Sequence, residues 1–377
     1  MKREPQLLGL SLYHALNDGS LAVFLAALPV MRLAVGLSYI EIGTILSAGL
    51  LATVLMQFVF GYLADRGHAR KALVAGLVTI AIIDLIFTQA GNYWQVLFFY
   101  VLLRGAGGVY HPVSFSTIFR TLEHRSSLGF QSAFGDASIA IAMVSTGFAA
   151  ETFGWRVPFY GWGIVACIGV GIFVTLTRTI HQSVGRINDE PVTNTRTKHF
   201  FILQFNGAFL QCIFATFTGF MALFLNVNLN LSPGFSALIV ALWLGIGVTA
   251  SFNAGRIIGF LQNERRTLAM TCTLSALALV FAFIAAEMRM WVVALILLVI
   301  SGPPHFLAYP VLYGMIGITS NQRHLGLAYA TNLSLSLMAG SIISYLAGYL
   351  SSIYSLSVIL PVLALAAVGA SVTACLL

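Results

Sequence analysis

Charged residues are scarce in this sequence. Asp, Glu, Lys and Arg make up 8% of its 377 residues, against about a quarter in soluble globular proteins. Hydrophobic residues make up 59%, and the mean hydropathy is +0.91. This composition excludes a water-soluble fold with a separate soluble catalytic or signalling domain. The continuous apolar runs also argue against a membrane β-barrel, in which apolar and polar residues alternate.

Cysteine is rare as well, and each of the four lies inside an apolar run without a CxxC pairing. The sequence therefore predicts neither a disulfide framework nor a zinc site. It also lacks the HExxH and GxSxG patterns of membrane hydrolases, so we expect no enzyme activity, no metal and no cofactor. The net charge of +7 is interpreted as a marker of membrane topology, and no nucleic-acid partner is expected.

The apolar runs have the length of membrane spans, because about 20 residues are needed to cross a bilayer as a helix. Lys2 and Arg3 precede the first run, which carries His14, Asn17 and Asp18 and is therefore interpreted as a span rather than a cleavable signal. We predict an all-α integral membrane protein with 12 transmembrane helices. They are expected near residues 7–31, 40–63, 72–90, 93–119, 127–150, 157–178, 200–226, 235–258, 268–286, 291–317, 325–350 and 354–376.

One long polar stretch, residues 179–199, follows the sixth span and divides the chain into two halves. We predict an N-terminal six-helix bundle over residues 1–178, a cytoplasmic linker over 179–199 and a C-terminal six-helix bundle over 200–377. With the N-terminus inside, fifteen of the 19 Lys and Arg residues fall on the cytoplasmic side and three on the other. This bias predicts that both termini are cytoplasmic in a multi-pass protein of the cell inner (plasma) membrane.

The two halves show a weak internal repeat at an offset of about 194 to 198 residues. Leu37-Ser38 aligns with Leu231-Ser232, and Trp94 aligns with Trp291. This offset favours two pseudo-symmetric bundles, an arrangement that many secondary transporters use to build a site near the membrane midplane.

The segment Gly61-Tyr-Leu-Ala-Asp65-Arg66-Gly67-His-Ala-Arg70-Lys71 lies between the second and third spans. It resembles the loop signature of the major facilitator superfamily, and Gly154-Trp-Arg-Val-Pro-Phe159 is similar to another link of that family. The resemblance implies the major facilitator fold and a monomeric transporter. It implies a gating loop formed by Gly61, Asp65, Arg66, Arg70, Lys71 and Arg120. The alternative is a solvated basic loop that only sets topology.

A second pair of motifs lies in spans 1 and 4: His14-Ala-Leu-Asn17-Asp18 and Gly105-Ala-Gly-Gly-Val-Tyr-His111-Pro112. This pair resembles the fosmidomycin-resistance branch of the superfamily, which implies export of drugs or metabolites. Span 5, from Gly135-Asp136 to Glu151, departs from the glycine and proline pattern expected of exporters. The direction of transport is therefore left open.

Ionisable residues inside a bilayer are costly and usually face a cavity or a partner. His14 and Asp18 are four residues apart and share one helix face, and His111 and Asp136 lie at a similar depth. We predict that Asp18, His14, His111 and Asp136 form a proton relay. The alternative is a set of buried hydrogen bonds that fasten the helices together.

Arg104 lies close to the midplane of span 4, where a guanidinium could hold an anionic substrate or pair with Asp18. A permanent salt bridge is the alternative.

The prolines of Gly302-Pro303-Pro304-His305 and Tyr309-Pro310 indicate a break in span 10 that is either a gate or a static kink. Predicted substrate-binding residues are Arg104, Asn17, Gln211, His305, Tyr309, Tyr313 and Asn332.

These features favour a secondary active transporter that works by alternating access and exports a small organic molecule or drug-like compound in exchange for protons. A second hypothesis is uptake or exchange of an organic anion held by Arg104. A third is transport of lysolipids or other amphiphiles. The expected partners are thus a small-molecule substrate, protons and the lipid bilayer.

Overall fold

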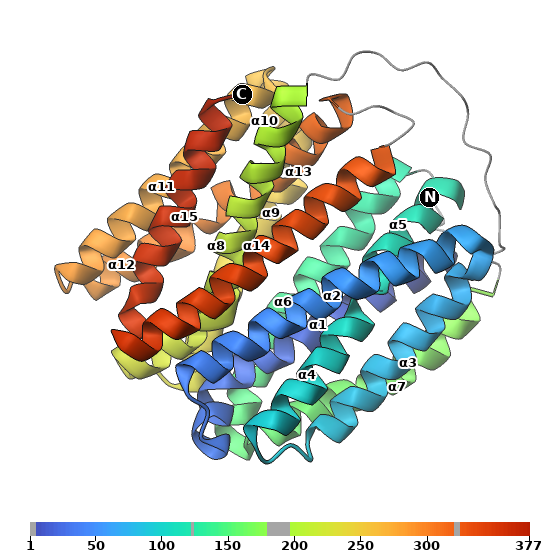
Figure 1. Cartoon of the computed structure of the whole chain (residues 1–377), viewed down its shortest axis with the longest axis horizontal. Helices are drawn as coiled ribbons and strands as arrows, with labels where there is room; N and C mark the ends of the chain where they lie inside the picture. Colours follow the sequence, from blue (N-terminus) through green and yellow to red (C-terminus); the bar gives the residue numbers. More distant parts are fainter. Residues whose placement is uncertain (1–4, 122–123, 179–196, 320–324) are drawn as a thin grey trace.

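The computed structural model describes residues 5–121, 124–178, 197–319 and 325–377, and within these ranges the chain is helical without strands (Figure 1). The first half contains α1 to α7, with a five-residue π-helix, η1, between α2 and α3. Their bounds are α1 Pro5–Val35, α2 Tyr39–Leu63, η1 Ala64–His68, α3 Ala69–Phe87, α4 Tyr93–Gly107, α5 Tyr110–Thr121, α6 His124–Phe153 and α7 Arg156–Leu176.

The second half contains α8 to α15, with a short 3-10 helix, η3, before the last. Their bounds are α8 Thr197–Leu229, α9 Pro233–Phe252, α10 Ala254–Leu261, α11 Glu264–Glu287, α12 Trp291–Ile300, α13 Gly302–Thr319, α14 Leu325–Ile353, η3 Leu356–Val358 and α15 Ile359–Cys375. Spans 4 and 10 are each divided into two helices, at Gly108-Val109 and at Ser301. The predicted break before Pro303 is therefore confirmed.

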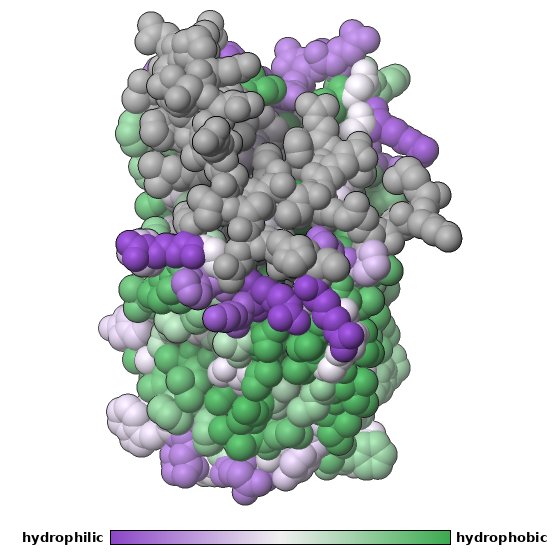
Figure 2. Space-filling view, turned by 90° about the vertical axis from the view of Figure 1, so that its right-hand side faces the viewer, coloured by the Kyte–Doolittle hydropathy of each residue, from purple (hydrophilic) through white to green (hydrophobic). Residues whose placement is uncertain are grey.

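Among the described residues, 11 helical segments are long and apolar enough to cross a membrane by length and composition. The remaining predicted span, 72–90, coincides with α3, which carries Arg70, Lys71 and Asp84 within 19 residues. The predicted count of 12 fits the fold, but length and composition alone do not confirm it. Figure 2 shows the matching surface, in which a broad hydrophobic region is bounded by hydrophilic side chains.

Each half packs mainly on itself. In the first half α1 contacts α6 and α7, α2 contacts α4, and α3 contacts α7; in the second half α8 contacts α14 and α15, and α9 contacts α13. The halves meet along two helix pairs, α2 with α14 and α6 with α9. We call the end of the molecule where α1 begins and α15 ends the terminal side, and the opposite end the distal side (Figure 1).

The two halves are in tight contact toward the distal side. On α2 and α14, Gly43 and Gly348 cross so closely that a Cβ added to Gly43 would lie 2.9 Å from the Cα of Gly348. One turn further along, the hydroxyls of Ser47 and Ser341 are 2.8 Å apart. The axes of α2 and α14 diverge from there toward the terminal side (Figure 1). The structure is therefore a state in which the distal side is closed.

The second distal contact joins α6 and α9 through Glu151. Its Oε2 atom accepts a hydrogen bond from the Ser232 hydroxyl (2.8 Å) and another from the backbone N–H of Gly234 (2.9 Å). Gly234 lies in the first turn of α9, where backbone N–H groups lack partners within the helix and favour a negative charge. Glu151 thus links the two halves in the distal-closed state.

Replacing Glu151 by Ala is expected to weaken this closure. Loss of exposed charge-assisted hydrogen bonds costs about 1 kcal/mol, or roughly a fivefold shift toward states open on the distal side. Double electron–electron resonance between spin labels at Phe153 and Tyr354, both exposed, measures that shift. Glu287→Ala, which removes an exposed carboxylate at the end of α11, is the control. An unchanged distance distribution in Glu151→Ala contradicts the proposed role.

Candidate functional site

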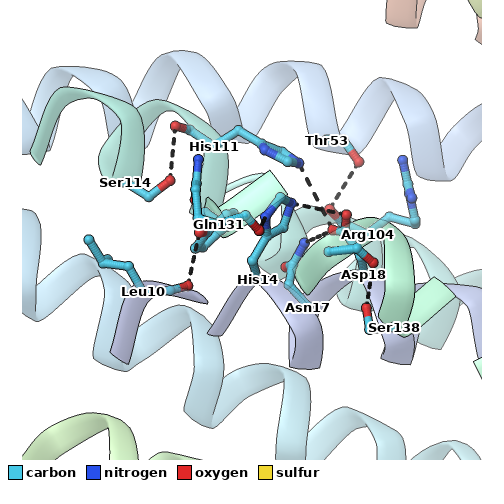
Figure 3. A network of polar contacts seen from close by, with 12 residues as sticks. Leu10, His14, Asn17, Asp18, Thr53, Arg104, His111, Ser114, Gln131 and Ser138 are labelled. Atoms are coloured by element: carbon cyan, nitrogen blue, oxygen red, sulfur yellow. Dashed lines mark hydrogen bonds and ion pairs between the residues drawn. The ribbon is translucent and has the colours of Figure 1, made fainter. Parts of the chain in front are cut away.

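A polar cluster lies within the otherwise apolar first half (Figure 3). His14 and Asp18 project from consecutive turns of α1, and His14 Nε2 lies 3.1 Å from Asp18 Oδ2. The structure therefore brings this predicted pair into contact. Asn17 donates from its amide nitrogen to Asp18 Oδ1 at 2.7 Å, so both carboxylate oxygens have a polar neighbour.

His111 joins the cluster from α5, and its Nε2 lies 4.0 Å from Asp18 Oδ1. Contacts from the two histidines converge on Asp18 in Figure 3. The break at Gly108-Val109 packs closely on α2, where a Cβ on Gly108 would lie 2.7 Å from the Thr53 carbonyl. Side-chain exposure is 27% for His111 and 15% for Asp18, against 6% for His14. His111 is therefore the most exposed of these three residues.

Three supporting residues were not predicted from the sequence as site residues: Gln131, Tyr110 and Gly135. The backbone carbonyl of Gln131, on α6, is 2.8 Å from His14 Nδ1. The Tyr110 ring stacks on the His14 ring with centroids 4.6 Å apart, and its hydroxyl contacts the Leu10 carbonyl and the Gln131 side chain. A Cβ on Gly135 would lie 2.5 Å from His14 Nε2. These contacts fix the orientation of the His14 ring.

One ring nitrogen each of His14 and His111 and one carboxylate oxygen of Asp18 lie within 4.8 Å of one another, a spacing that could also accommodate a metal ion. The expectation of no metal stays a prediction. Asp136 is half-buried and interacts electrostatically with His14 and Asp18, and also with Tyr309 and Tyr313 of α13. Within the described ranges it makes no hydrogen bond or ion pair. Asp136 therefore borders the cluster and faces the second half.

Arg104 does not pair with Asp18. Its backbone carbonyl accepts a hydrogen bond from Thr53 (3.0 Å), and its Cγ lies against Gly49 of α2. The guanidinium Nε is buried without a hydrogen-bond partner, and in the part of the chain that the structure describes Arg104 forms no salt bridge. The predicted alternative of a permanent salt bridge therefore finds no partner among the described residues.

The second half contributes an aromatic group around His305. This histidine is 1% exposed and stacks on Trp243 at 5.1 Å, and neither ring nitrogen has a partner among the described residues. The Tyr309 hydroxyl is likewise buried without a partner, whereas the Tyr313 carbonyl accepts a hydrogen bond from Tyr329. His305 and Tyr309 thus retain unused hydrogen-bonding capacity.

The other predicted substrate-binding residues have partners within the protein. The Asn332 amide donates to the Leu203 carbonyl and fastens α14 to α8. Gln211 packs against Gly340, at which a Cβ would lie 3.1 Å from the Gln211 Cγ. Asn17 is 1% exposed and donates to Asp18. These contacts describe structural roles and do not test binding of a substrate.

The predicted gating loop is helical in this structure, with a turn at Gly67, whose φ is +81°. Arg66 lies over the Tyr62 ring at 4.6 Å, and Arg70 donates to the carbonyls of Thr177 and Val174 at the end of α7. Lys71 is exposed, and Gly61 is half-buried near Pro112. The side chains of Asp65 and Arg120 lie outside the described residues.

Comparison with known proteins gives the class of this fold. Residues 10–342 match the family model of the Major Facilitator Superfamily. Two solved structures share the fold. One is a bacterial homolog of the human lysosomal transporter Spinster, inward-facing and unoccupied (TM-score 0.74, 17% identity, 100% of this chain and 95% of that chain). The other is a mutant of the nucleoside transporter NupG (TM-score 0.78, 14% identity, 98% of each chain).

The chain belongs to the Major Facilitator Superfamily. It is a multi-pass membrane transporter of small molecules and not an enzyme. A curated relative, the Fosmidomycin resistance protein of Escherichia coli (strain K12), is 30% identical over 105 residues, which is 28% of this chain. The match spans about a quarter of that relative's length, 26%.

Proposed function

We propose that this chain is a proton-coupled secondary transporter that exports a small organic molecule by alternating access of its two halves. The observation that carries the proposal is the position of Asp18 between the imidazoles of His14 and His111. Carboxylate and imidazole groups are the side chains that most commonly relay protons within membranes. The partial match to the Fosmidomycin resistance protein supports export of a drug-like compound.

The proposal takes the terminal side as cytoplasmic in the cell inner membrane, because fifteen of the 19 Lys and Arg residues fall on that side by the predicted topology. The distal-closed structure then corresponds to an inward-facing state. In this proposal the exposed parts of Asp18 and His111 face cytoplasmic water, and the contacts at Gly43 and Glu151 close the opposite side. We further propose that the transporting unit is a monomer. Its two bundles, residues 1–178 and 200–377, move relative to each other and are joined by the linker at 179–199.

The test is transport of fosmidomycin into proteoliposomes with an acidic lumen. If outward movement of protons drives inward movement of the drug, the purified protein accumulates fosmidomycin only while the pH gradient is maintained. A one-unit gradient supports about tenfold accumulation in one-for-one exchange, and a protonophore abolishes it. Equal uptake with and without the gradient contradicts proton coupling, while counterflow in preloaded vesicles separately measures whether fosmidomycin is carried at all.

A second candidate function is uptake or exchange of an organic anion. The observation that favours it is Arg104, whose Nε is buried without a partner and whose charge no described carboxylate balances. Counterflow that is independent of pH and is lost when Arg104 is replaced by Ala supports this alternative over proton-driven export.

A further inference from the structure

The hydrogen bonds of His14 determine where its protons are. Nδ1 lies 2.8 Å from the backbone carbonyl of Gln131. A carbonyl only accepts hydrogen bonds, so Nδ1 carries a proton. On the opposite side of the ring, Nε2 lies 3.1 Å from Asp18 Oδ2. A second proton must lie between these two atoms, because two lone pairs would repel each other at this distance.

Asp18 contributes both of its oxygens as acceptors. Oδ1 accepts from the Asn17 amide at 2.7 Å, and Oδ2 faces His14. The hydrogen bond from Asn17 stabilises the ionised carboxylate, and imidazole is the stronger base of the two groups that share the proton. The shared proton is therefore on His14 Nε2, and the ring carries protons on both nitrogens in this state.

The His14 ring is held so that Nε2 faces Asp18. Tyr110 stacks on one face of the ring, and its single hydroxyl proton is donated to the Leu10 carbonyl at 2.9 Å. The same hydroxyl also contacts Gln131 Oε1, so Tyr110 lies against both α1 and α6 at the His14 ring. Gly135 leaves room for Nε2, because even a Cβ there would lie 2.5 Å from that atom.

We propose that His14 Nε2 is the atom that holds the coupling proton, and that Tyr110 and Gln131 are positioning residues for it. The assignment rests on the proton coupling proposed above and specifies the site within it. The charged and titratable groups around the ring are Asp18 and Tyr13 on α1, Arg104 on α4, Tyr110 and His111 on α5, and Asp136 on α6.

The two oxygens of Asp18 connect His14 to water. Release begins when the Nε2 proton passes to Asp18, which leaves His14 neutral with its proton on Nδ1. The proton is then on Oδ2, whereas His111 Nε2 lies 4.0 Å from Oδ1, so the carboxyl group must rotate and approach His111 before it passes the proton to Nε2. His111 is the most exposed member of the cluster. His111 then gives the proton to water, and Asp18 is again ionised. One proton has left the site, and no other bond has changed.

The experiment is nitrogen NMR of the full-length protein in lipid nanodiscs, with all eight histidines labelled with 15N and no ligand added. At about pH 7 we expect the signal of a histidine with both ring nitrogens protonated. This signal should be absent in His14→Gln and retained in His68→Gln, the exposed control on η1. In Asp18→Asn the His14 signal should become that of a neutral ring. A neutral His14 ring in the wild type, or a doubly protonated one in Asp18→Asn, overturns the assignment.

A second variant tests positioning without removing the proton site. Tyr110→Phe keeps the stacked ring and removes the hydroxyl, so we expect an intact fold, a broadened His14 signal and a shifted pH profile of fosmidomycin transport. An unchanged signal and profile overturn the positioning role. If the wild type shows gradient-driven transport and folded His14→Gln retains it, the assignment is wrong. If the NMR result holds and the wild type is not driven by pH, the protonation of His14 stands, and the proton coupling proposed above is what fails.

Discussion

Asp18→Asn is expected to abolish accumulation of substrate against a gradient while leaving exchange at equal pH in place. The amide has the size of the carboxylate and can still contact Asn17, but it cannot take a proton from His14 or pass one to His111. A pH difference of one unit corresponds to about 1.4 kcal/mol, so the accumulation ratio should fall from about ten to about one. Fosmidomycin uptake into proteoliposomes with an acidic lumen measures both ratios.

The matched control is Asp84→Asn. Asp84 is fully buried on α3 and lies against Gly163 of α7, outside the cluster. The same isosteric change there removes a membrane carboxyl without touching the proposed relay, so gradient-driven accumulation should be retained. If Asp18→Asn accumulates substrate as well as Asp84→Asn does, Asp18 has no coupling role and Asp136 becomes the carboxyl to test.

The fold was predictable because a bilayer permits few structures. Backbone groups in lipid must be hydrogen-bonded within the segment, so a run of about 20 apolar residues forms a helix. Every predicted span corresponds to one described helix or to two consecutive ones. The break at Ser301 follows from Pro303 and Pro304. The break at Gly108-Val109 was not predicted, although Pro112 follows it and a proline ring clashes with the carbonyl four residues earlier, here that of Gly108.

Two parts of the site were predictable: the contact of His14 with Asp18 within one helix, and the approach of His111, which was predicted to lie at a similar depth in span 4. The four-residue spacing of His14 and Asp18 fixes their contact, because side chains one turn apart share a helix face. The contacts of His14 with Gln131 and Gly135 depend on the rotation of α6 relative to α1. Span 5 is apolar on most of its surface, so the sequence gives little information about that rotation. The sequence did contain one indication of the Tyr110 contact, because Tyr110 directly precedes His111, a predicted member of the cluster.

Arg104, for which pairing with Asp18 was one of two alternatives, illustrates the same limit. Opposite charges at similar depth predict an ion pair, yet the histidines and Asn17 surround the carboxylate in this structure. Arg104 instead packs its Cγ against Gly49 and leaves Nε without a partner. Because the charge of Arg104 is unbalanced, we expect its replacement to raise stability and to abolish transport.

Arg104→Met is expected to raise the stability of the substrate-free protein and to abolish transport. A buried donor without a partner costs about 1 to 3 kcal/mol. Arg104 is only partly buried, so its replacement by an apolar side chain of similar length should stabilise the fold by about 1 kcal/mol and raise the melting temperature by roughly 2 °C. Thermal unfolding in detergent and fosmidomycin counterflow measure the two effects.

Arg70→Met provides the contrast for stability, because the Arg70 guanidinium does have partners, the carbonyls of Thr177 and Val174. Its replacement should lower the melting temperature. If Arg104→Met also lowers it, Arg104 has a structural anion partner and the alternative of a permanent ion pair is correct. If it raises the melting temperature while counterflow persists, the charge is not used for the substrate. A more stable protein without transport is the outcome expected of a cation that is kept unpaired for its ligand.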